Sequence, residues 1–180
     1  MNVKDDKELV ELTAKDPEKG FRYLMAKYKE AVYWHIRRLV VAHEDAQDAT
    51  QETFVRVFRS LSDFKGECSL RSWIYRIATN EALRLLSRYK EERVSLDDSS
   101  GELSSLMADE YVDYSDLETV KLQKAILSLP AKQQLAFNLR YYNDLGYDEI
   151  AGIIGSTVDG AKSNYHIAKD KIVKYMNANN

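Results

Sequence analysis

Residues 145–171, LGYDEIAGIIGSTVDGAKSNYHIAKDK, constrain the fold more than any other stretch of the chain. Apolar residues recur at helical spacing up to Ile154, and Gly155 follows, where a positive φ can end a helix. Thr157 can cap a second helix that begins at Val158. The pattern therefore predicts two helices joined by a tight turn, the geometry of a DNA-reading helix-turn-helix.

The second expected helix carries Lys162, Ser163 and His166 on one side. Side chains of these types can hydrogen-bond to base edges in the major groove. An ordinary helical hairpin that never touches DNA would have the same pattern, and this segment alone leaves that alternative open.

Composition indicates an all-α protein. The 180 residues include only 7 Gly and 2 Pro, and 44% are hydrophobic, which is enough for real cores. The single Cys68 excludes an intramolecular disulfide framework and a Cys-only zinc site, and no metal-ligand or cofactor pattern is present. With no signal peptide and no run of about 20 apolar residues, we expect a cytoplasmic protein without membrane insertion.

The net charge of −3 is divided unevenly along the chain. Residues 19–94 carry 15 basic and 10 acidic side chains, and residues 121–180 carry 8 and 5. Residues 95–120 carry 8 acidic side chains and no Lys or Arg, which indicates a connector between two mildly basic blocks. We predict two small helical domains joined by a flexible acidic linker, with boundaries at residues 1–94, 95–115 and 116–180.

The hydrophobic periodicity predicts four helices on each side of this linker. They are expected near residues 5–15, 17–42, 44–62, 69–91, 116–128, 131–142, 147–154 and 158–176. The linker itself has two interpretations. It is either a plain solubilising spacer or a segment on which the domains close, hiding DNA-binding surfaces in the free protein.

Residues 45–61, DAQDATQETFVRVFRSL, predict a helix with two distinct sides. An apolar stripe is expected to pack into a core, and it includes Phe54 and Phe58. The other side carries residues at i, i+3, i+4, i+7 and i+11, namely Asp48, Gln51, Glu52, Val55 and Arg59. A solvated face is the plain interpretation, but Val55 among polar groups favours a docking surface.

Residues 64–90, FKGECSLRSWIYRIATNEALRLLSRYK, interleave aromatic and basic side chains. A loop around Gly66 is followed by a helix that carries Trp73, Tyr75 and Arg76. This mixture is typical of single-stranded nucleic-acid binding, because bases stack on rings while guanidinium groups follow the phosphates. In the alternative interpretation, Trp73 and Tyr75 are core anchors.

Taken together, these motifs resemble the extracytoplasmic-function (ECF) sigma factors, the smallest class of the sigma-70 family, over residues 17–93 and 116–176. DAQDATQETFVRVF is similar to the core-polymerase-binding segment of region two. FKGECSLRSWIYRIATNEALRLL is similar to the segment of that region that melts the promoter and reads the −10 element. LPAKQQLAFNLRYYNDLGYDEIAGIIGSTVDGAKSNYHIAKDKI is similar to region four, which reads the −35 element.

The resemblance implies a non-enzymatic factor that binds core RNA polymerase through its β and β′ subunits and recognises promoter DNA. It also implies an anti-sigma factor as a partner, and no metal or cofactor. Core binding is assigned to Asp48, Gln51, Glu52, Val55 and Arg59. Melting and −10 contacts are assigned to Phe64, Lys65, Gly66, Trp73, Tyr75, Arg76 and Asn80. Contacts to the −35 element are assigned to Arg140, Thr157, Lys162, Ser163, His166 and Lys169.

The sequence departs from the family pattern where the recognition helix begins. Asp159 and Gly160 stand where small residues are usual. A carboxylate at Asp159 favours the helix N-terminus but repels a nearby phosphate. The alternative function is a stand-alone two-domain helix-turn-helix regulator, which would bind an operator without polymerase.

Overall fold

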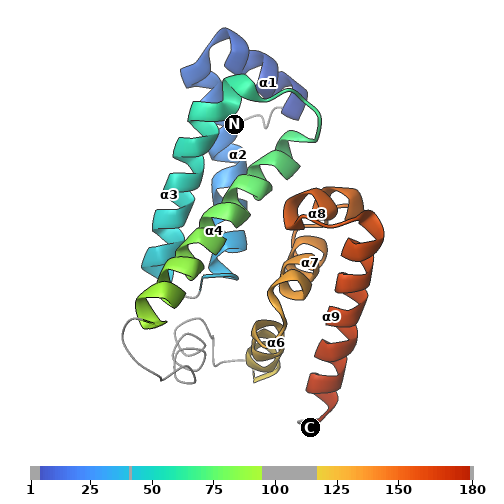
Figure 1. Ribbon diagram of the computed structural model, residues 1–180. Helices are drawn as coiled ribbons and strands as arrows, with labels where there is room; N and C mark the ends of the chain where they lie inside the picture. Colours follow the sequence, from blue (N-terminus) through green and yellow to red (C-terminus); the bar gives the residue numbers. More distant parts are fainter. Residues whose placement is uncertain (1–4, 41, 95–116, 179–180) are drawn as a thin grey trace. The chain divides into compact units, whose positions relative to one another are not determined.

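The computed structural model describes residues 5–40, 42–94 and 117–178, and every element in these ranges is a helix (Figure 1). The expected all-α class is therefore confirmed. The chain divides into two compact units, Met1–Glu91 and Glu92–Asn180. The expected linker at 95–115 lies outside the described residues.

Unit 1 contains α1 (Asp6–Lys15), α2 (Pro17–Arg37), α3 (His43–Ser60), the 3-10 turn η1 (Leu61–Asp63) and α4 (Leu70–Val94). Side chains satisfy free backbone N–H groups where the first two helices begin. The Asp5 carboxylate accepts a hydrogen bond from the Asp6 N–H at 2.7 Å, and Asp16 accepts one from the Lys19 N–H at 3.0 Å. Pro17 occupies the first position of α2, where no backbone N–H is needed.

All four helices of unit 1 contribute to its core, and α1 contributes Leu9. The fully buried side chains include Leu24, Val32 and Ile36 of α2, Val57 of α3, and Ile74 and Ala78 of α4. The N-terminal helix α1 is tied to α2 because Asp6 Oδ1 accepts hydrogen bonds from Lys27 Nζ at 2.7 Å and from the Tyr28 hydroxyl at 2.6 Å. Burial and this hydrogen bond to Asp6 raise the pKa of Tyr28 above its usual range.

α2 ends at Arg37, five residues before the expected end at residue 42. The Leu39 N–H donates to the Ile36 carbonyl at 2.9 Å, so the last turn tightens. Leu39 and Val40 then turn into the core, where they are 6% and 0% exposed. This burial against other helices is not visible in the local periodicity, which is why the expected end was wrong. α4 and α9 run slightly past their expected ends, which is within the usual uncertainty of helix boundaries.

Unit 2 contains α6 (Leu117–Leu127), α7 (Ala131–Tyr141), α8 (Tyr147–Ile154) and α9 (Val158–Ala178). Pro130 precedes α7 as its N-cap residue. α9 packs against each of the other three helices (Figure 1). Ala168 and Ile172 of α9 belong to a buried apolar cluster with Ala125, Ile126, Leu129 and Phe137. This packing fixes which side of α9 remains in solvent.

Candidate functional site

The turn between α8 and α9 has the expected helix-turn-helix geometry. Gly155 adopts the left-handed conformation with φ 62°, and its N–H donates to the Ala151 carbonyl. The Ser156 N–H donates to the same carbonyl at 3.0 Å. Thr157 Oγ1 then accepts a hydrogen bond from the Gly160 N–H at 3.0 Å, so Thr157 caps α9 as predicted.

The solvent side of α9 carries the side chains assigned to DNA reading. Lys162, Ser163, His166 and Lys169 are all exposed. The His166 ring lies 5.4 Å from the Tyr165 ring and 6.5 Å from the Tyr147 ring of α8, measured between centroids. The structure therefore brings these four residues together on one exposed side of one helix.

Arg140, at the end of α7, is held within unit 2. Its Nη1 donates to the Leu145 carbonyl at 3.0 Å and pairs with Asp144 Oδ1 at 3.3 Å. The guanidinium also lies 5.4 Å from the centroid of the Tyr147 ring. These contacts hold the turn between α7 and α8, where Asp144 has φ 50°. A phosphate contact by Arg140 would have to use the N–H groups that remain on this half-exposed side chain.

The outward face of α3 consists of Asp48, Gln51, Glu52, Val55 and Arg59, and all five side chains are exposed. Val55 is 40% exposed although it is aliphatic. Glu52 Oε1 lies 3.5 Å from Arg56 Nε, and Arg56 Nε lies 2.5 Å from Glu81 Oε1 of α4. A chain of charges thus links the edge of this face to the next helix.

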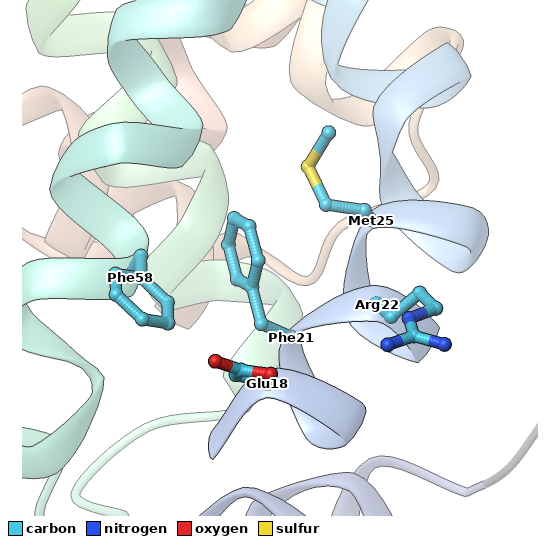
Figure 2. A pocket seen from close by; sticks show the side chains of 5 residues that line it. All are labelled: Glu18, Phe21, Arg22, Met25 and Phe58. Atoms are coloured by element: carbon cyan, nitrogen blue, oxygen red, sulfur yellow. The ribbon is translucent and has the colours of Figure 1, made fainter.

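An apolar groove lies between α2 and α3 beside this face (Figure 2). It has a volume of about 410 Å³ and is lined by Glu18, Phe21, Arg22, Met25 and Phe58. The Phe21 and Phe58 rings meet edge to face with centroids 4.9 Å apart. Phe58 is 46% exposed, so its expected place in the buried stripe of α3 was wrong. Its ring packs on Phe21 and also lines the groove.

One row of α4 carries three of the residues assigned to the opened strand. Trp73, Arg76 and Asn80 follow one another at i, i+3 and i+7, away from the buried Ile74 and Ala78. Trp73 is half-buried, whereas Asn80 is exposed. Arg76 is half-buried.

The loop before α4 leads to this row. Phe64 lies 5.2 Å from the Trp73 ring between centroids, and both rings are half-buried. Lys65 and Gly66 are exposed, and Gly66 has φ 72° with no atom near the position of a side chain. The structure therefore brings the loop and the α4 row together at the Phe64–Trp73 contact.

Tyr75 does not belong to this surface. It is 2% exposed, and its ring meets the buried His35 ring edge to face at 5.1 Å between centroids. His35 Nε2 in turn lies 2.8 Å from Thr79 Oγ1. The assignment of Tyr75 to strand binding was wrong, because a ring enclosed on this side of α4 cannot stack on a base. For Tyr75 the core-anchor interpretation is correct.

Residues 5–40, 42–94 and 117–178 hold neither a candidate metal site nor a candidate membrane span. These residues contain no cluster of three or more His, Cys, Asp or Glu side chains placed to hold a metal ion. Among the same residues, no helix combines the length and the apolar character needed to cross a membrane.

Comparison with known proteins identifies the family. Residues 24–92 match the family described as Sigma-70 region 2, and residues 119–172 match Sigma-70, region 4. The chain is 30% identical over 176 residues to the ECF RNA polymerase sigma-E factor of Salmonella typhimurium, covering 93% of this chain and 92% of that protein. The chain belongs to the ECF sigma factors of the sigma-70 family. It is therefore an RNA polymerase sigma factor, as the motifs predicted.

Other relatives agree with this family. The RNA polymerase sigma-H factor of Pseudomonas aeruginosa is 28% identical, covering 98% of this chain and 96% of that protein. CnrH, solved in complex with the cytosolic domain of CnrY, has a TM-score of 0.72 at 20% identity and covers 97% of this chain and 99% of its own. The sigma factor RpoE of Bartonella quintana, solved with the anti-sigma factor NepR, has a TM-score of 0.70 at 21% identity, with coverages of 90% and 99%. These two structures show a shared fold.

The two sigma-factor regions correspond to the two units. The region 2 match includes the outward face of α3 and the row on α4, and the region 4 match includes the helix-turn-helix. A stand-alone regulator is not favoured, because both regions are present in one chain. Sequence reasoning missed the groove at Phe58. A signal that could have found it is that Phe21 and Met25 are apolar at i and i+4 on the same side of α2 as the charged Glu18 and Arg22.

Proposed function

We propose that this sigma factor docks on the β and β′ subunits of core RNA polymerase through the outward face of α3. The observation that carries the proposal is that its five side chains are exposed together while the opposite side of the helix is buried. A partner can therefore reach them without rearranging the domain. The exposed Val55 supports docking, because an aliphatic side chain gains free energy only when a partner covers it.

The groove beside this face is proposed to extend the docking surface. Phe58 follows Val55 by three residues on α3, so the two exposed apolar side chains are neighbours on the helix surface. Aromatic side chains often carry much of the binding energy once a partner buries them in a well-packed pocket. A partner side chain that fills the groove would cover both Phe58 and Met25.

The row on α4 and the loop before it are proposed to hold the opened promoter strand. Trp73 and Phe64 offer rings for stacking, and Arg76, Lys65 and Asn80 offer charge and hydrogen bonds. Opening a duplex costs about 1.4 kcal/mol per base step, and stacking one base on a ring returns roughly 1–3 kcal/mol. A few captured bases can balance a few steps but not a full bubble, so core polymerase has to share the cost.

The exposed side of α9 is proposed to read the −35 element in the major groove. Lys162, Ser163 and His166 provide donors and acceptors for base edges, and Lys169 provides charge for a phosphate. Thr157 fixes the start of the helix, and Arg140 supports the turn before α8. We further propose that the protein acts in the cytoplasm and has no enzymatic activity of its own.

An anti-sigma factor is the proposed regulatory partner. Two proteins of the same fold were solved with such partners or with the cytosolic domain of a partner. A protein that covered the outward face of α3 would compete directly with core polymerase for the same exposed side chains.

Run-off transcription with core polymerase, on the promoter upstream of the protein's own gene, tests the proposal. We expect specific transcripts only when the factor and core are both present, and negligible specific DNA binding by the factor alone. Tight gel-shift binding by the isolated protein at physiological salt would contradict the proposal and support a stand-alone regulator.

The docking face is tested by reversing two charges, with Asp48→Lys and Glu52→Lys in one variant. We expect at least a tenfold loss of core affinity with unchanged helicity, because the reversal affects only exposed side chains. The matched control is Glu11→Lys with Glu30→Lys, which changes the charge equally at exposed sites on α1 and α2. If both variants lost core affinity equally, the loss would come from net charge and not from the outward face of α3.

A further inference from the structure

The first turn of α9 exposes an acidic side chain in the middle of the surface proposed to read DNA. Asp159, Ser163 and His166 follow one another at i, i+4 and i+7, so they form a single row. The row lies opposite the buried Ala161 and Ala168. Asp159 makes no hydrogen bond or ion pair with any residue in the described part of the chain. Its carboxylate is therefore available to a partner.

The backbone that carries Asp159 is held in place. The Gly160 N–H donates to Thr157 Oγ1 at 3.0 Å, and Asn164 Nδ2 donates to the Gly160 carbonyl at 2.9 Å. A Cβ atom at Gly160 would collide with Ser156 Oγ, so a larger residue there would force that side chain to rotate. The direction in which Asp159 leaves the helix is thus set before any DNA arrives.

A carboxylate in the major groove can only accept hydrogen bonds. The donors there are the N4 amino group of cytosine and the N6 amino group of adenine. Adenine places its N7 acceptor beside that donor, so it repels a carboxylate, whereas guanine and thymine offer O6, N7 and O4 acceptors. Phosphates repel the carboxylate as well. Cytosine is therefore the base whose hydrogen bond best offsets the free-energy cost of removing the Asp159 carboxylate from water.

Val158 presents the complementary apolar feature. It is the first residue of α9 and is 51% exposed, next to Asp159. The C5 methyl of thymine is the apolar group that the major groove displays. An exposed valine at this position gains free energy by covering such a methyl.

We infer that Asp159 and Val158 are specificity-determining residues that select a cytosine and a nearby thymine in the upstream promoter element. This inference rests on the proposed −35 role of α9. Asp159 contributes no general attraction to DNA, so its effect is discrimination between bases. Lys162, one turn further along, supplies the positive charge that keeps the carboxylate near DNA.

The test uses holoenzyme and a library of the promoter upstream of the protein's own gene, randomised in its upstream element. Transcribed members are sequenced for the wild type and for Asp159→Asn. We expect the wild type to favour cytosine at one position by about tenfold. Asp159→Asn should shift that position to adenine, because a carboxamide both accepts from N6 and donates to N7.

Asp170→Asn is the matched control. Asp170 is exposed, lies on the same row at i+11, and is displaced by about 16 Å along the helix, beyond the part that enters the groove. This control should keep the cytosine preference. If Asp159→Asn keeps it too, or raises activity equally on all sequences, the inference is overturned while the proposed function stands. If the wild-type holoenzyme transcribed no library member, both the inference and the proposed function would be overturned.

Val158 is tested on the best library member with thymine replaced by deoxyuridine, which removes only the methyl group. Wild-type activity should fall about three- to fourfold, and Val158→Ala should be insensitive to the replacement. An equal fall in both proteins would show that Val158 does not contact the methyl.

Discussion

The outward rows of α4 and α9 both follow the helical period but differ in chemistry. On α4 the row begins with an aromatic ring, Trp73, which rests on Phe64, and continues with Arg76. On α9 it begins with a carboxylate, Asp159, followed by Ser163 and then an imidazole. Rings gain free energy by stacking on base faces, which are accessible only after the duplex opens. Short polar groups gain it by matching donors and acceptors on base edges, which a closed duplex already displays.

This difference separates two steps of one reaction. The α9 surface suits recognition of intact DNA, and the α4 surface suits capture of a strand that has already separated. Neither surface could replace the other, because the base faces and the base edges are not exposed in the same state of the DNA. If the distinction lies in the exposed rows themselves, substitutions in one row should affect opening and substitutions in the other should affect recognition.

The largest effect is expected from a ring that lies on α4 but outside its outward row. Tyr75→Ala should lower the free energy of unfolding of unit 1 by about 3–5 kcal/mol, because the ring is 2% exposed in the core. Both Trp residues of the chain, Trp34 and Trp73, lie in unit 1, so urea unfolding followed by Trp fluorescence reports on this unit. Tyr75→Phe should retain most of the stability and the promoter opening. If the Tyr75→Phe protein were stable but failed to open the promoter, Tyr75 would have to contact DNA after all.

Trp73→Ala should affect opening rather than recognition. We expect a loss of about 1–3 kcal/mol in open-complex formation on duplex promoters, from one lost stacking platform. A template with a pre-opened −10 segment should recover most of that loss. Trp34→Ala is the control, since Trp34 is 44% exposed on α2 and outside the row. Equal defects on closed and pre-opened templates would instead indicate damage to the fold.

Phe58→Ala tests whether the groove belongs to protein docking, which neither row performs. The half-exposed ring should contribute about 1–2 kcal/mol to core affinity, with a smaller effect on stability. A titration of core polymerase with labelled factor measures the change. Trp34→Ala again serves as an exposed aromatic control that does not line the groove. Unchanged core affinity with Phe58→Ala would remove the groove from the docking surface.

The smallest effect is expected from Lys162→Ala on the α9 side. A base contact by this residue should change activity by about 1 kcal/mol, and only on promoters that share one upstream sequence. Lys174→Ala, an exposed lysine three turns further along α9, provides the control. A uniform loss on all upstream sequences, with a reduced salt dependence, would make Lys162 a phosphate contact.

Much of the candidate site could be predicted because helical periodicity identifies residues that share a side. The five residues of the α3 face were found in this way, as were Lys162, Ser163 and His166. The turn before α9 could also be predicted, because the hydrogen bonds of Gly155 and Thr157 join residues three or four positions apart. Periodicity could not predict the contacts of Arg140 with Asp144 and Leu145, because these residues belong to a turn without a regular period.

The sequence by itself determined the helices, the two units' motifs and the family, because these depend on residue spacing and on local capping. Only the tertiary structure decided which side of α4 was enclosed, and so separated Tyr75 in the core from Trp73 on the surface. It likewise exposed Phe58 at the edge of its stripe and turned Leu39 and Val40 inward. Whether an apolar side chain is buried depends on the helices packed against it, and those neighbours are distant in the sequence.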